Sequence, residues 1–250
     1  MPNNNSHKHF RNVPVGFGVI TPLVEPKKKR VNKNELMPAD YSRIALVGGS
    51  GCGKTTLAEN LVTKQWLEND IIIWMARNLN QPFYQLLREF VEENDYGDTI
   101  FFFDQLIELD KLAVMCGCGK GRKTILVVDD FITKIEDPII LDYFSRSRHY
   151  CMTLLVLLQD YGCFPTKYRS NTSHLALFQG SVTSKRRRGL IFNDFLNGTD
   201  VDKFHKLCSK YISKGTEGKN HNFLWIDVDA VPSEKVRVGL TEFVDITSDK

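Results

Sequence analysis

A glycine-rich octapeptide lies between a short apolar run and a helical pattern. Residues 48–55 read GGSGCGKT and match the spacing G-x-x-x-x-G-K-[ST]. Residues 44–47 before it are continuously apolar, as in a buried strand, and residues 55–66 after it have the periodicity of a helix. A strand–loop–helix junction points backbone N–H groups and a helix N-terminus at one place, which favours a bound anion. The sequence therefore predicts a loop that cradles phosphate groups.

Each part of this loop has an expected contact with a nucleoside triphosphate. The glycines allow positive φ angles and a close approach of the backbone to the phosphates. Lys54 is expected to neutralise the β- and γ-phosphates, and the Thr55 hydroxyl to ligate Mg²⁺. Cys52 is interpreted as a small filler rather than a reactive thiol. The expected cofactors are ATP and Mg²⁺, and the expected nucleotide contacts are Gly48, Gly49, Ser50, Gly51, Cys52, Gly53, Lys54, Thr55 and Thr56.

Apolar runs and helical patterns alternate along the rest of the chain. Further strands are expected at 71–75, 99–103, 124–128, 152–158 and 175–178, with helices at 82–93, 104–114 and 139–149 between them. Beyond Gly180 the patterns predict helices at 182–196 and 201–212 and strands at 222–228 and 235–238. Strands that are apolar throughout are typical of parallel sheets covered on both faces. The predicted fold class is therefore α/β, a doubly wound and mostly parallel sheet with helices on both faces.

Two carboxylates follow one of these strands directly, and an amide follows the next. The run ILVVDD places Asp129 and Asp130 at a strand end, where parallel α/β sheets bind their ligands. Asp129 is expected to hold Mg²⁺, and Asp130 to act as the base that activates water, although its side chain is shorter than the more usual Glu. Gln159 ends the next strand and fits a sensor that hydrogen-bonds the γ-phosphate and the attacking water.

The basic residues are concentrated near the start of the chain. The formal net charge is +3, yet residues 1–33 carry seven Lys/Arg and one Glu. We expect a basic, flexible arm over 1–36, an ATPase domain over 37–240 and a polar tail over 241–250. The run Pro26-Lys27-Lys28-Lys29-Arg30 is read as a nuclear-import signal, a DNA phosphate contact or a solvated charge run. Six scattered cysteines indicate a reducing, intracellular setting, and no run approaches the roughly 18 apolar residues of a membrane span.

Three segments together carry a family resemblance. They are Met37-Pro38 with the strand into GGSGCGKT, the strand ILVVDD, and the stretch YFSRSRHYCMTLLVLLQDYGCFPTKYRSNTSHLALF. This arrangement resembles the poxvirus-type genome-packaging ATPases of nucleocytoplasmic large DNA viruses, which belong to the FtsK/HerA class of motors with a RecA/FtsK-like core. The resemblance covers residues 37–180, over half of the chain.

The resemblance implies a ring-shaped motor that pumps double-stranded DNA into a preformed capsid by ATP hydrolysis. Implied partners are duplex DNA, further copies of this chain, and capsid or inner-membrane virion proteins. The implied location is the host cytoplasm or virus factory and the virion, with the nucleus as an option through residues 26–30. The family roles map onto Lys54 and Thr55 for nucleotide and metal, Asp129 for magnesium, Asp130 for water activation and Gln159 for phosphate sensing.

A ring ATPase also needs a positive group that reaches the neighbour's γ-phosphate. The candidates are Arg148, Arg169 and Arg186, and Arg169 is preferred because it precedes the last core strand. Arg186 lies in the run Lys185-Arg186-Arg187-Arg188, which also suits a DNA-facing surface.

Other functions share parts of this sequence pattern. A zinc site from Cys116, Cys118, His205 and Cys208 is disfavoured because the first two are spaced too tightly. A small-molecule kinase shares the phosphate loop, but the Asp pair and Gln159 favour water as the acceptor. A GTP switch requires a guanine-reading Asn-Lys-x-Asp late in the chain, and the nearest match precedes the loop. A DNA helicase or segregation ATPase of the same motor class remains an open alternative.

Overall fold

The computed structural model describes residues 36–64, 66–119, 121–182, 184–212 and 221–247. Within them, nine strands form one sheet in the order β3-β2-β4-β5-β1-β6-β7-β8-β9. The first six strands in this order, β3-β2-β4-β5-β1-β6, pair in parallel. Strands β7, β8 and β9 extend the sheet from β6 as antiparallel strands. The strands are β1 (Arg43–Val47), β2 (Ile71–Ala76), β3 (Ile100–Phe103), β4 (Thr124–Asp129), β5 (Met152–Leu158), β6 (His174–Phe178), β7 (Phe223–Asp227), β8 (Val236–Val238) and β9 (Glu242–Val244).

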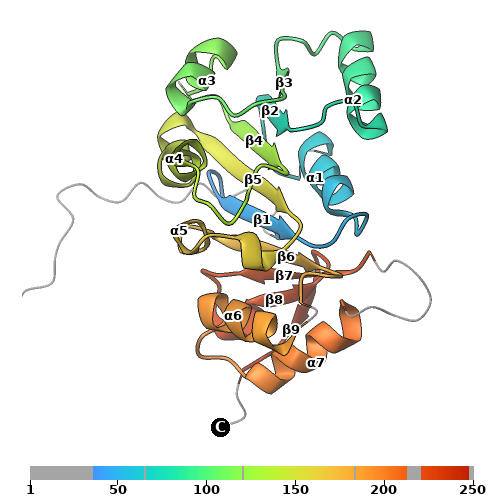
Figure 1. The fold of residues 1–250 in the computed structure, drawn as a ribbon, viewed down its shortest axis with the longest axis vertical. Coiled ribbons are helices and arrows are strands. Elements are labelled where there is room, and N and C mark those ends of the chain that lie inside the picture. Colours follow the sequence, from blue (N-terminus) through green and yellow to red (C-terminus); the bar gives the residue numbers. More distant parts are fainter. Residues whose placement is uncertain (1–35, 65, 120, 183, 213–220, 248–250) are drawn as a thin grey trace, which may run out of the picture.

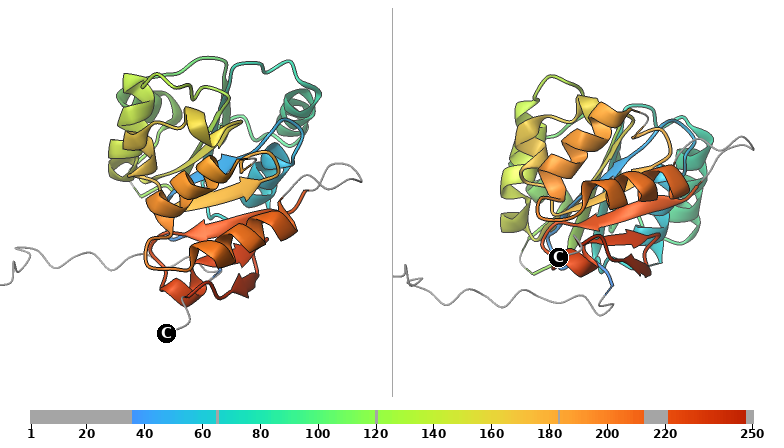
Figure 2. Two further views of the ribbon diagram at one scale, coloured as in Figure 1. Left: turned by 60° about the horizontal axis from the view of Figure 1, so that its bottom comes forward. Right: turned by 90° about the horizontal axis from the view of Figure 1, so that it is seen from below.

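Helices cover both faces of this sheet (Figure 1). One face carries α1 (Lys54–Thr63) and α2 (Pro82–Glu93). The other carries α3 (Leu109–Cys116), α4 (Pro138–Arg146), α5 (Thr166–Arg169), α6 (Lys185–Phe195) and α7 (Val201–Tyr211). Figure 2 shows α6 and α7 crossing the antiparallel half of the sheet, where Phe192 and Phe204 approach with ring centroids 6.2 Å apart.

The strand sequences explain why two helical layers are needed. Successive side chains of a strand point to opposite faces. In β1, Ala45 and Val47 enter the core beneath α3 to α7, while Ile44 and Leu46 enter the core beneath α1 and α2. All four are buried. The doubly wound, mostly parallel α/β fold predicted from the sequence is confirmed.

Four helices differ from the sequence prediction at one end by three residues or more. Helix α1 ends at Thr63 where residue 66 was expected, and α6 begins at Lys185 where residue 182 was expected. The helix expected from residue 104 begins at Leu109, and it ends where Gly117 adopts φ 65°, the left-handed conformation common after helices. The helix expected to run to residue 149 ends at Arg146 and continues as the 3₁₀ turn η1 (Ser147–Tyr150). Cys151 then takes φ 58°, which turns the chain into β5.

The ordered body extends into the segment expected to be a polar tail. Glu242–Val244 form the edge strand β9 against β8, and Ile246 is buried among residues of the core. The buried Arg237 on β8 donates from Nη1 to the carbonyl oxygens of Leu36 (2.6 Å) and Leu240 (2.8 Å). These contacts join the start of the described chain and the turn between β8 and β9 to the same strand.

Two further expectations from the sequence concern a membrane span and the basic run at residues 26–30. In the described part of the chain, no helix has the length and apolar character needed to cross a membrane. The basic run at residues 26–30 lies outside the described residues.

Candidate nucleotide-binding site

The glycine-rich loop is fixed at the carboxyl ends of the parallel strands. The Gly48 N–H donates to the Leu158 carbonyl of β5 (3.1 Å), and the Gly49 N–H donates to the Gln179 carbonyl just after β6 (3.0 Å). A Cβ at Gly48 would lie 2.5 Å from the Cβ of Phe178, so no larger residue fits there. Gly53 has φ 102°, which side chains rarely permit. The glycines are therefore required by backbone shape and close packing.

The loop leads into α1 with its side chains in three environments. Ser50 and Gly51 are exposed at its tip, and Cys52 is buried. Thr55 and Thr56 lie in the first turn of α1, which contains no acidic residue. Burial raises the pKa of the Cys52 thiol, with the charge of Lys54 offsetting part of that rise. This supports the interpretation of Cys52 as a filler, because the thiolate is the reactive form.

Lys54 lies against the loop from the inside. Its side chain is buried, and Nζ donates to the carbonyl oxygens of Gly48 (2.8 Å) and Gly49 (3.0 Å). The ammonium group is therefore held against the backbone of the phosphate loop. Burial raises the pKa of the Asp129 carboxyl, and the positive charge of Lys54 offsets part of that rise. The structure therefore brings the loop lysine and the first acid of the pair together.

The acidic pair and Gln159 meet on adjacent strands. Asp129 ends β4, in register with Leu157 of β5. Asp130 follows with φ 62°, a left-handed conformation in which Asp is more common than most residues. Gln159 Nε2 donates to Asp130 Oδ1 at 3.2 Å. The two side chains predicted to act on water are thus hydrogen-bonded to each other.

Tyr84 on α2 is a site residue that the sequence did not reveal. It is buried, and its hydroxyl donates to Asp129 Oδ2. Its ring packs edge-on against Trp74 of β2, with centroids 5.9 Å apart. Burial raises the pKa of Asp129, and the hydrogen bond from Tyr84 offsets part of that rise. The only sequence signal is a hydroxyl-bearing residue on the apolar stripe Tyr84, Leu87 and Val91 of α2.

The donor set fits Mg²⁺. The Thr55 hydroxyl and the Asp129 carboxylate are hard oxygen ligands, and Mg²⁺ sites in nucleotide enzymes use one or two such groups with the substrate phosphates. By contrast, Cys116 and Cys118 lie at the end of α3, whereas His205 and Cys208 belong to α7. Among the residues that the structure describes, no three His, Cys, Asp or Glu side chains gather as a metal cluster.

The three candidate arginines occupy separate places. Arg169 Nη1 lies 2.5 Å from Asp194 Oδ2 of α6, and its guanidinium covers the ring of Tyr161 at 5.3 Å. Arg148 lines a polar pocket with Arg43 and Ser173 at the edge where the parallel strands begin, opposite the loop. Arg186 is exposed on α6. Arg169 is held within its own chain, and its role as a finger toward a neighbouring copy stays a prediction.

Comparison with known proteins identifies the family. The family model of the poxvirus A32 protein matches residues 28–186. The chain belongs to the poxvirus A32 protein family. The resemblance read from residues 37–180 is thereby confirmed. A comparison with curated protein sequences gave no match.

Solved structures share the fold. The genome packaging NTPase B204 from Sulfolobus turreted icosahedral virus 2, in complex with ATP-gammaS, is 16% identical with a TM-score of 0.53, covering 79% of this chain and 96% of that one. The same NTPase in complex with AMPPCP is 15% identical with a TM-score of 0.54, again covering 79% and 96%. At this identity the likeness establishes the fold of the A32-family chain. The roles of its site residues are argued from its own geometry.

Proposed function

We propose that this A32-family chain is an ATP-driven motor that moves double-stranded DNA into a viral capsid. The observation that carries the proposal is the pairing of Asp130 with Gln159 at 3.2 Å, at the ends of β4 and β5 on one side of the loop strand β1. A carboxylate and an amide placed together suit the activation of water, so hydrolysis is favoured over transfer to a second substrate. B204, which shares the fold, is described as a DNA-packaging ATPase.

Each residue then has one task in hydrolysis. Lys54 neutralises phosphate charge at the curve of the loop. Thr55 and Asp129 would hold Mg²⁺, which when bound offsets the charge on the phosphate oxygens. Asp130 accepts a proton from the attacking water, while Gln159 orients that water and fixes the carboxylate through its Nε2 hydrogen bond. This bond positions the shorter Asp side chain in place of the Glu often found there.

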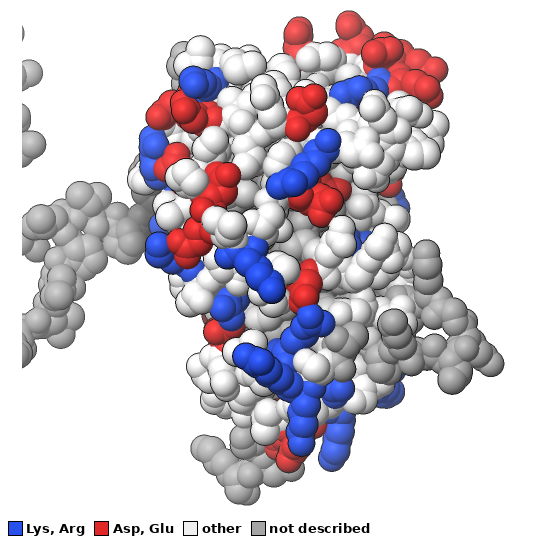
Figure 3. Space-filling view, in the orientation of Figure 1, with Lys and Arg blue, Asp and Glu red and all other residues white. Residues whose placement is uncertain are grey.

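A basic surface on α6 and α7 is the proposed DNA contact. Lys and Arg side chains gather over these two helices (Figure 3). We define the basic surface as Lys185, Arg186, Arg187, Arg188, Lys203, Lys206 and Lys210. Four of these cations lie in the first turn of α6, where the helix dipole disfavours positive charge. Helix stability therefore does not account for them. Arg187 pairs with Asp160 and Arg188 donates to Ser209, whereas contact with DNA phosphates accounts for the exposed Lys185 and Arg186.

The remaining parts of the proposal concern assembly and place. Further copies of the chain form the ring, and a capsid or inner-membrane virion protein docks it. The chain acts in the host cell, at the virus factory and in the virion. Nuclear entry depends on residues 26–30, which also suit DNA contact.

Steady-state ATP hydrolysis by the purified chain, with and without linear duplex DNA, tests the proposal. We expect DNA to stimulate hydrolysis, and Lys54→Ala and Asp130→Asn to abolish it. Lys167→Ala is the matched control, because this exposed lysine forms an ion pair with Glu136 (2.7 Å) away from the loop. Hydrolysis indifferent to DNA contradicts the motor, and phosphate delivered to a small acceptor assigns the chain to the kinases.

A further inference from the structure

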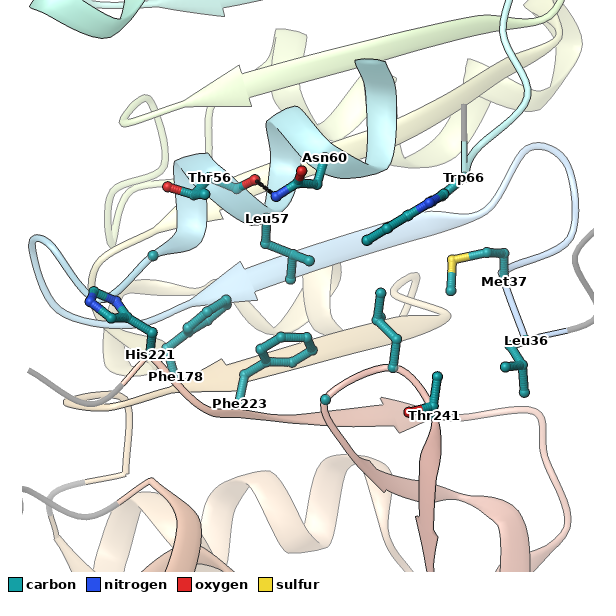
Figure 4. A pocket seen from close by; sticks show the side chains of 13 residues that line it. Leu36, Met37, Thr56, Leu57, Asn60, Trp66, Phe178, His221, Phe223 and Thr241 are labelled. Carbon is teal, nitrogen blue, oxygen red and sulfur yellow. Dashed lines mark hydrogen bonds between the residues drawn. The ribbon is translucent and has the colours of Figure 1, made fainter. Parts of the chain in front are cut away.

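An apolar pocket adjoins the phosphate loop on the side away from the acidic pair. Its volume is about 710 Å³. It runs along α1 from Gly53 and Thr56 to Met37 near the start of the described chain. Figure 4 shows His221, Phe178 and Phe223 gathered at the loop end, with Trp66 and Met37 at the far end.

The pocket and the loop are one continuous surface. Gly53 belongs to both, and Thr56 lies in the first turn of α1. A Cβ at Gly53 would lie 3.3 Å from His221 Nδ1 and 3.7 Å from Phe178 Cε1, so these two rings touch the loop itself. A nucleotide whose phosphates lie in the loop can therefore extend past Gly53 to these aromatic side chains.

The strand order fixes the direction in which a nucleotide lies. In the sequence β4-β5-β1-β6-β7, the loop strand β1 is central. Asp130 and Gln159 stand beyond the loop on the β4–β5 side. Phe178 ends β6 and Phe223 begins β7 on the other side. A triphosphate whose last phosphate faces Asp130 therefore directs its nucleoside toward Phe178 and Phe223.

The chemistry of the loop end suits a planar aromatic base. The Phe178 and Phe223 rings lie 5.0 Å apart at an interplanar angle of 32°, and the His221 ring lies beside Phe178 in Figure 4. Side chains with hydrogen-bonding groups are few, and the Asn60 amide already donates to the Thr56 carbonyl at 2.9 Å. Stacking on aromatic side chains tolerates any base, because every base has a π-face.

We infer that His221 and Phe223, with the buried Phe178 packed behind them, form the nucleoside subsite and hold the base by stacking, with little discrimination between adenine and guanine. This inference rests on the proposed function, because it assigns the far end of the same nucleotide. The phosphate loop supplies affinity for the triphosphate, and the aromatic subsite supplies affinity for the base.

Titration of the full-length chain with ATP-gammaS, GTP-gammaS and inorganic tripolyphosphate, each with Mg²⁺, separates these two contributions. We expect Phe223→Ala to weaken ATP-gammaS binding about tenfold, equivalent to about 1.4 kcal/mol, and to leave tripolyphosphate binding unchanged. Phe223→Leu keeps apolar volume without an aromatic face and is expected to behave alike. Phe243→Ala is the matched control, a half-exposed phenylalanine on β9 outside the pocket. Wild-type affinities for the two nucleotides are expected to agree within about fivefold.

The outcomes distinguish the subsite from the proposed function. Unchanged ATP-gammaS affinity in both Phe223 variants, with binding lost in Lys54→Ala, overturns the subsite and leaves the motor standing. A preference of a hundredfold or more for one base overturns recognition by stacking. Loss of self-association in Phe223→Ala with nucleotide affinity intact assigns the pocket to a second copy of this chain. If wild type binds neither nucleotide nor tripolyphosphate, the proposed function fails as well.

Discussion

Replacing Tyr84 by Phe removes one hydroxyl from a buried contact and changes little else. In the wild type that hydroxyl donates to Asp129 Oδ2, and both groups are largely shielded from water. The Phe ring fills the same space against Trp74. The substitution therefore isolates the hydrogen bond to the proposed magnesium ligand.

The expected magnitudes follow from the nature of this bond. A hydrogen bond to a charged group contributes about 1.5–3 kcal/mol, so the free energy of unfolding should fall by about 2 kcal/mol. Loss of the donor also frees the Asp129 carboxylate to rotate. Removing a side chain that orients a metal ligand weakens metal binding roughly 10–100-fold, so the Mg²⁺ concentration for half-maximal ATP hydrolysis should rise at least tenfold.

Two assays measure these effects, and Tyr143→Phe is their control. Tyr143 is also buried, but its hydroxyl donates to the Ile107 carbonyl on the opposite face of the sheet. Urea unfolding should show a loss in both variants, whereas only Tyr84→Phe should change the Mg²⁺ dependence of hydrolysis. An unchanged Mg²⁺ dependence in Tyr84→Phe, or an equal shift in both variants, refutes the positioning of Asp129 by Tyr84.

Three further substitutions test other parts of the structure. Gly48→Ala places a Cβ 2.5 Å from that of Phe178, so the free energy of unfolding in urea should fall by about 1–3 kcal/mol. Titration should also show a loss of nucleotide binding. Wild-type stability and binding in this variant would contradict the close packing of Gly48. Burial raises the pKa of Cys208 to about 12, so the neutral thiol stabilises the fold below its unfolded pKa of roughly 8.5, and this contribution falls as the pH rises. Urea unfolding should show wild type losing about 2 kcal/mol relative to Cys208→Ala between pH 8.5 and 10, and a constant difference contradicts this. Asp160→Asn breaks the 2.5 Å contact with Arg187 that joins the basic surface to the residue after Gln159. The Asp160→Asn variant should then bind DNA with normal affinity, but DNA should stimulate its ATP hydrolysis less than in the wild type. The charge-reversed double variant Asp160→Arg/Arg187→Asp should recover the stimulation. Full stimulation in Asp160→Asn would show that this ion pair does not couple DNA binding to hydrolysis.

The sequence was most informative where burial and backbone shape are encoded locally. Uniformly apolar runs predicted the parallel strands, because both faces of such strands must be covered. The motif ending in Lys54 and Thr55 predicted the loop, because positive φ angles and close packing require glycine at fixed positions. The sequence predicted that Asp130 and Gln159 each act on the attacking water, and the structure shows a hydrogen bond between them.

The sequence was least informative where distant segments meet. Tyr84 reaches Asp129 across 45 residues, and no periodicity of α2 specifies which strand end its hydroxyl will contact. Arg169 is joined to Asp194 across 25 residues, so a local pattern shows its charge without its partner. Edge strand β9 is three residues long and largely exposed, so its sequence lacks the apolar run that marked the other strands.

Displacement of a third strand from a linear duplex tests the central claim most directly, because a motor that moves along DNA removes a triplex-forming oligonucleotide from its path. The account predicts displacement that requires ATP and Mg²⁺, is retained in Lys167→Ala and is lost in Lys54→Ala. ATP hydrolysis by the wild type at full rate on the same DNA, with the third strand left in place, would contradict it.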